Sequence, residues 1–287
     1  MVVRKPRLRA FTAMAVFVLL SLAPALTYGA IVQQIGFDGG VGATKAVTLS
    51  QATTAGSTII VMSSAVGSVP TVPTDNQANT WPTAVVGPGG SQDLTVWLLQ
   101  NCPAGITVIT VHQNGAQGWI IEESGVLASS FDKSAGQSIA NVNVTSGSSG
   151  TLSQANEVAY GFTAIQNGVS YMFTAGSGWD ASAFTNYGGP GAPYTAGNQG
   201  NTLEGAISFV ERQVVTSTTA ISATMTQGLG GTVFAAIITL KQSGGPPPGS
   251  NQSFSLTGVA ALFREPAVND STMPADRLIL PHFKKVA

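Results

Sequence analysis

The chain consists of short apolar runs, mostly of four to ten residues, separated by clusters of Gly, Asn, Asp, Ser and Pro. The runs are rich in Val, Ile, Thr and aromatic residues, which suit a half-buried sheet surface. No window of 11 residues shows a convincing helical period. Some 13 such runs lie between residues 31 and 241, which is too many for one small sheet. The sequence therefore predicts an all-β fold, an antiparallel two-sheet β-sandwich that is jelly-roll-like.

Low charge excludes several classes of protein. Only 9% of the 287 residues are charged, against roughly 25% in an average domain. Neither a disordered chain nor a coiled coil has this composition. The formal net charge of −1 argues against a basic nucleic-acid-binding face, so we expect no nucleic-acid partner. The single cysteine excludes an internal disulfide and multi-cysteine metal sites.

Residues 1–29 have the order of a secretory signal peptide. A basic stretch, Arg4–Arg9, precedes the apolar run Phe11–Leu26, and small residues follow it. We expect cleavage after Gly29. The alternative is an uncleaved anchor, but the apolar run has about 16 residues and contains Pro24, whereas a spanning helix needs roughly 20. The prediction is a secreted or cell-surface protein with no transmembrane segment after cleavage.

The rest of the chain divides into three parts. Residues 30–242 hold the predicted strands, with four basic and ten acidic side chains, a net charge of −6. Residues 243–250 form a Gly/Pro linker. Residues 251–287 are too few for a core of their own, so we expect a disordered tail or the remnant of a truncated second module.

A long loop, residues 176–201, is the predicted ligand site. It carries Trp179, Tyr187 and Tyr194 among amide side chains and Asp180. Aromatic platforms beside hydrogen-bonding groups suit sugar rings. The alternative is that Trp179 packs over a sandwich edge and the loop carries no ligand.

Few residues could serve as catalytic acids. Glu122 and Glu123 are adjacent, so on a strand they point to opposite faces. We expect one of them to face inward, as an acceptor for loop amides or as a functional acid. Glycoside hydrolysis would require a second carboxylate, for which Asp180, Glu204 and Glu211 are candidates.

Asp75 and Asn79 are the candidate metal ligands. Asp and Asn side chains stabilise turns by bonding to nearby backbone, and their oxygens also suit Ca²⁺. The segment offers too little acid for a full site, so we expect a turn and no cofactor, with a calcium loop as the alternative.

The segment Asp75–Trp81 resembles the "TD..GNTW" turn of a group of secreted bacterial β-sandwich domains. Trp97–Gly105, Ile121–Val126, which resembles an "EYSG" strand, and the closing run Phe234–Lys241 are similar to further stretches of that group, in the same order. Ala78 stands where the group usually has Gly, and Glu123 where it has an aromatic residue. The resemblance implies an exported β-sandwich and assigns no catalytic residue.

Three functions agree with these observations. The first is an exported, non-catalytic β-sandwich module that binds glycan or another cell-surface polymer. The second is a carbohydrate-active hydrolase or lyase on a jelly roll, which would use Glu122, Glu123 or Asp180. The third is a structural or adhesive cell-surface protein.

Overall fold

A computed structural model describes residues 29–38, 44–64, 70–87, 94–112, 117–165, 172–186, 196–201, 206–228 and 230–243. The predicted signal segment up to residue 28, most of the linker and the tail lie outside the described residues. The described residues form strands and no helix, and all antiparallel pairings confirm the expected all-β sandwich class. Accordingly, no helix long and apolar enough to cross a membrane occurs in the described part.

The first eight strands form a five-stranded and a three-stranded sheet. The larger sheet has the order β1-β8-β3-β6-β5 and the smaller one β2-β7-β4. These strands are β1 (Ala30–Asp38), β2 (Thr44–Thr48), β3 (Thr58–Ser64), β4 (Thr71–Asp75), β5 (Thr83–Val86), β6 (Leu94–Leu99), β7 (Val108–His112) and β8 (Gln117–Ser124).

The next eight strands repeat this topology. Their larger sheet has the order β9-β16-β11-β14-β13 and their smaller one β10-β15-β12, so each label is its counterpart's plus eight. The strands are β9 (Val126–Ala140), β10 (Asn143–Thr145), β11 (Glu157–Ile165), β12 (Phe173–Ala175), β13 (Asn198–Asn201), β14 (Ala206–Val215), β15 (Thr224–Gln227) and β16 (Thr232–Gln242). The described fold is therefore an internal duplication, a first repeat of β1–β8 and a second of β9–β16.

The duplication left a trace in the sequence. Residues 48–52 and 151–155 both read Thr-Leu-Ser-Gln-Ala, and each segment leads into the central strand of its repeat, β3 or β11. Leu49 and Leu152 are both buried, each between the larger and the smaller sheet of its own repeat. Trp81 follows β4 and Trp179 follows β12, and these two side chains also fill the corresponding clusters.

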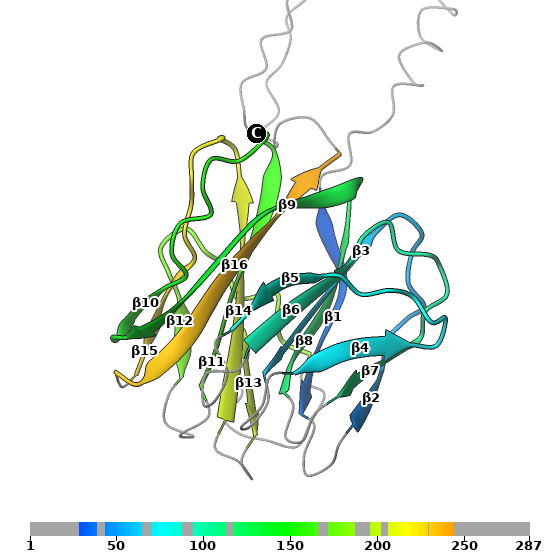
Figure 1. Ribbon diagram of the computed structural model, residues 1–287, viewed down its shortest axis with the longest axis horizontal. Coiled ribbons are helices and arrows are strands. Elements are labelled where there is room, and N and C mark those ends of the chain that lie inside the picture. The colour runs from blue at the N-terminus through cyan, green and yellow to red at the C-terminus, as the bar shows by residue number, and fades with distance from the viewer. Residues whose placement is uncertain are drawn as a thin grey trace, which may run out of the picture. The chain divides into compact units, whose positions relative to one another are not determined.

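The four sheets form four layers, and three apolar clusters hold them together. The two five-stranded sheets face one another across the central cluster, which contains Ile60 and Met62 of β3 and Phe162 of β11. The two three-stranded sheets cover the outer sides, and in Figure 1 they lie at opposite sides of the molecule. Strand β3 is buried on both faces because Ile59 and Val61 point into the outer cluster of the first repeat. Covered faces on both sides explain the continuous apolar runs of the sequence.

Candidate functional site

Glu122 and Glu123 point to opposite faces of β8, as the sequence predicts, but both are buried. The reason is that both faces of their sheet are covered. Glu122 accepts hydrogen bonds from the Thr54 backbone amide at 2.7 Å, from the Ser57 hydroxyl at 2.8 Å and from the Gln33 side-chain amide at 2.7 Å. Three donors fix this carboxylate as an anchor for the loop that precedes β3.

Glu123 lies between the two repeats. Its Oε1 is 2.6 Å from Arg212 Nη2 on β14, and its Oε2 accepts the Tyr160 hydroxyl hydrogen of β11 at 2.5 Å. The second Arg212 contact goes to the carbonyl of Gly29 at 3.0 Å. Burial raises the pKa of Glu123, and the Arg212 charge acts in the opposite direction. This network therefore joins the repeats by a desolvated ion pair.

Asp180 lies beside the same arginine but faces elsewhere. Its backbone exchanges hydrogen bonds of 2.9 and 2.8 Å with that of Arg212, while its Oδ1 accepts the Ser182 amide at 2.7 Å. The Ser182 hydrogen bonds lower the pKa of Asp180. Asp180 thus pairs with Arg212 through the backbone, while its carboxylate acts within its own turn.

The aromatic loop is only partly described. Trp179 is 9% exposed and packs in the outer cluster of the second repeat. Phe184 is fully buried in the central cluster. Tyr187 and Tyr194 lie outside the described residues, as does Glu204. Little of the Trp179 ring is left exposed for a ligand. The described aromatic residues of this loop therefore pack in the core and do not form a binding platform at the surface.

Asp75 organises the turn that carries the family resemblance. Its Oδ1 accepts the Gln77 amide at 2.7 Å and the Asn79 side-chain amide at 3.1 Å, and its Oδ2 accepts the Trp81 ring N–H at 2.9 Å. Ala78 has a φ of 58°, in the left-handed region. Glycine adopts that conformation without the steric cost that a Cβ atom brings. Among the described residues, no group of three or more His, Cys, Asp or Glu side chains could hold a metal ion.

Two further acids are buried: Glu211, which the sequence offered as a candidate partner acid, and Glu157, which it did not. Glu211 is fully buried under the β12–β15 sheet, where its Oε2 accepts the Gly176 amide at 3.1 Å. Burial raises its pKa to about 8. Glu157 was not predicted at all. It is buried at the start of β11, and burial raises its pKa to about 7, an effect that the neighbouring Asp132 carboxylate reinforces.

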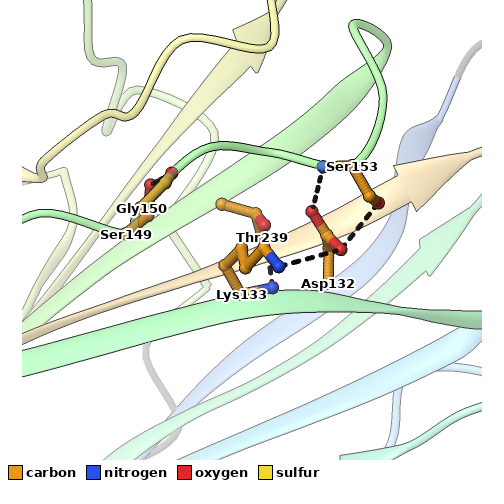
Figure 2. Close-up of polar contacts among 6 residues, drawn as sticks. All are labelled: Asp132, Lys133, Ser149, Gly150, Ser153 and Thr239. Carbon is orange, nitrogen blue, oxygen red and sulfur yellow. Dashed lines mark hydrogen bonds and ion pairs between the residues drawn. The ribbon is translucent and has the colours of Figure 1, made fainter.

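Asp132 and Ser153 fasten the second Thr-Leu-Ser-Gln-Ala segment (Figure 2). Asp132 accepts the Ser153 amide at 2.8 Å and the Ser153 hydroxyl at 2.7 Å. In the first repeat, Gln33 accepts the equivalent Ser50 hydroxyl at 2.9 Å. Lys133 lies 4.0 Å from Asp132, and its side chain is 39% exposed whereas that of Asp132 is 7% exposed. The cluster in Figure 2 is the second repeat's version of a loop anchor.

The β10-β15-β12 sheet turns an uncharged polar surface outward. Thr226 on the central strand lies opposite both Asn143 and Thr174, and Thr224 lies opposite Thr145. Directly paired residues share a face of the sheet. Thr145 is half-buried and the other four are exposed, while Met225 and Phe173 face the core. We call these five side chains the second outer face: Asn143, Thr145, Thr174, Thr224 and Thr226.

The corresponding surface of the first repeat has similar chemistry. Thr110 on β7 lies opposite Ala46 and Thr74, and His112 lies opposite Thr44. The His112 ring contacts the Thr74 hydroxyl at 3.2 Å. Val47 and Val111 point the other way, into the core. We call the following side chains the first outer face: Thr44, Ala46, Thr48, Thr74, Val108, Thr110 and His112.

Comparison with known proteins adds no assignment. No protein-family model, curated protein or solved structure matches the chain.

Proposed function

We propose that this protein is an exported, non-catalytic module that binds an uncharged polysaccharide, and that the second outer face is the binding surface. The order of charges and apolar residues in the first 29 positions supports export. The observation that carries the proposal is a sheet face of four threonines and one asparagine, in register on three strands.

The chemistry of this face suits a chain of sugars. Hydroxyl and amide groups donate and accept hydrogen bonds, and threonine methyl groups can contact the apolar faces of sugar rings. The strands place these groups about 4.8 Å apart across the sheet and about 7 Å apart along it. Such a grid offers several contacts to a polymer that lies across it.

Charge decides among classes of polymer. The five side chains are all uncharged, whereas residues 30–242 carry a net charge of −6. An anionic polymer would be repelled by the domain, and a cationic one would find no carboxylate on this face. An uncharged polysaccharide meets neither obstacle.

The carboxylates support a non-catalytic role. Glu122 has three hydrogen-bond donors, and Glu123 is paired with Arg212 between the repeats. Both side chains are fully buried, so neither is placed to reach a polymer at the surface. Their arrangement supports structural roles and gives the hydrolase hypothesis no open pair of acids among them.

Affinity electrophoresis tests the proposal. The full chain is run through gels that contain galactomannan, mixed-linkage β-glucan or hydroxyethyl cellulose. Retardation by at least one polymer is expected, and the triple variant T174V/T224V/T226V should weaken binding by about tenfold or more, since each lost hydrogen bond contributes roughly 0.5–1.5 kcal/mol. Valine preserves the shape and the strand preference of threonine.

A matched control is the triple variant T216V/T218V/T219V, in which three exposed threonines after β14 are changed. It should bind like the parent chain. Equal loss in both triple variants, or no retardation of the parent by any polymer, would remove the second outer face from consideration. Shortening of the polymer during the assay would instead support the hydrolase hypothesis.

A further inference from the structure

We infer that the duplication makes the protein bivalent, with one polysaccharide-binding face on each repeat, so that one molecule cross-links two polymer chains. This inference rests on the proposed function and extends it to the first outer face. Its basis is the correspondence of the two small sheets, β2-β7-β4 and β10-β15-β12, whose strands occupy the same positions in the two repeats.

The two faces share their chemistry although most of their residues differ. On the first outer face, Thr44 and Thr48 lie on the same side of β2, and Thr110 occupies the middle of β7. On the second, Thr224 and Thr226 lie on the central strand β15. Within the described part of the chain, the hydroxyl groups of these five residues make no hydrogen bond to another side chain, and no carboxylate belongs to either face. Outward threonine hydroxyls are thus common to both repeats, on β2 and β7 in the first and on β15 in the second.

The faces point in opposite directions. Each small sheet covers the outer side of its own five-stranded sheet, and the five-stranded sheets pack against each other (Figure 1). Stacked sheets lie about 10 Å apart, so four layers separate the two faces by roughly 30 Å. A single straight segment of polymer cannot lie on both faces, which is why occupation of both requires two segments.

The connection between the repeats is rigid. Glu123 of the first repeat is held by Arg212 and Tyr160 of the second, within a continuous apolar core. The faces are therefore fixed relative to each other, unlike two modules on a flexible linker. Rigid, oppositely directed sites favour cross-linking over simultaneous binding to one chain, because the geometry forbids the second contact with the same segment.

Three variants of the full chain test bivalency. The first changes the first outer face, T44V/T48V/T110V. The second changes the second outer face, T174V/T224V/T226V, and the third combines all six substitutions. Circular dichroism and thermal unfolding establish that each variant is folded before binding is measured.

Two measurements are made with the polymer that retards the parent chain. In affinity electrophoresis, each single-face variant should still be retarded, though less than the parent, and the six-fold variant should lose retardation. In light scattering of the soluble polymer, the parent should raise the scattered intensity several-fold with a maximum at intermediate protein ratio, and each single-face variant should give no rise.

The outcomes separate the two proposals. If the parent binds and the second-face variant alone abolishes binding, the protein is monovalent: bivalency is wrong and the proposed function stands. If the first-face variant scatters like the parent, bivalency is also wrong. If no polymer retards the parent, the proposed function fails and bivalency fails with it. A parent that cross-links and two single-face variants that bind without cross-linking support the inference.

Discussion

The carboxylate of Glu123 and the guanidinium of Arg212 lie 2.6 Å apart, and they join strand β8 of the first repeat to strand β14 of the second. The Glu123 side chain is fully buried. A buried ion pair contributes little net stability over an apolar replacement. Loss of one partner, however, leaves the other charge buried and unpaired. The pair therefore fixes how the two repeats face one another.

Removal of Arg212 should be costly for this reason. We expect R212M to lower the free energy of unfolding by about 3–5 kcal/mol, because an unpaired carboxylate stays in the core. The double variant E123Q/R212M should lose clearly less, since no charge is left. Urea unfolding measures both. The control K133M removes a cation that is 39% exposed and 4.0 Å from its partner, and it should cost less than about 1 kcal/mol. Equal losses in R212M and K133M would show that the core pair does not hold the repeats.

The pH dependence of stability should reveal the buried acids. The folded-state pKa of Glu211 is raised to about 8 and that of Glu157 to about 7, both by burial. The folded chain thus keeps protons that the unfolded chain releases above about pH 4.5. Stability should fall as pH rises from about 5 to 8, by at most about 1.4 kcal/mol per pH unit for each group.

The variant E211Q should flatten this fall, because the amide cannot ionise. Urea unfolding at pH 5, 6.5 and 8 gives the slope. The pKa of Asp180 is lowered, so its contribution to stability is lost on the acid side, and D180N should leave the slope between pH 5 and 8 unchanged. A slope in E211Q equal to that of the parent would mean that Glu211 is ionised in the fold.

How much of this was predictable from the sequence depends on which contacts decide each feature. The strand class follows from local composition, and the structure confirms it. Adjacent Glu122 and Glu123 point to opposite faces of β8 as predicted. Both are buried because the small sheet β2-β7-β4 covers the face that was expected to be open. That covering layer comes from strands far away in the chain, which local patterns do not place.

The duplication was visible in principle. The identical Thr-Leu-Ser-Gln-Ala segments start 103 positions apart, at Thr48 and Thr151, but most of the sequence around them has diverged. The sequence around Glu157 does not indicate its raised pKa either, because the neighbouring carboxylate of Asp132 lies on another strand. The outer faces could be read only after pairing placed Thr226 between Asn143 and Thr174.

The coupling between Glu157 and Asp132 can be measured directly. The Asp132 charge raises the pKa of Glu157, so D132N should lower that pKa from about 7 towards its ordinary value. Carboxyl-carbon NMR of ¹³C-glutamate-labelled protein follows the titration. D180N serves as the control and should leave the titration unmoved. A pKa of Glu157 that is the same in D132N and in the parent would show that burial alone sets it.

The turn that begins at Asp75 offers a test of the resemblance itself. Ala78 adopts a φ of 58°, where a residue with a Cβ is disfavoured by roughly 1–2 kcal/mol relative to glycine, while glycine costs about 0.5–1 kcal/mol in chain entropy. We expect A78G to stabilise the protein by about 0.5–1 kcal/mol in urea unfolding. As a control, A55G in the loop before β3, where the φ of Ala55 is not positive, should be neutral or destabilising. If A78G lowers stability as A55G does, the turn does not require the left-handed residue, and the Gly preference of the resembled group has no bearing on this chain.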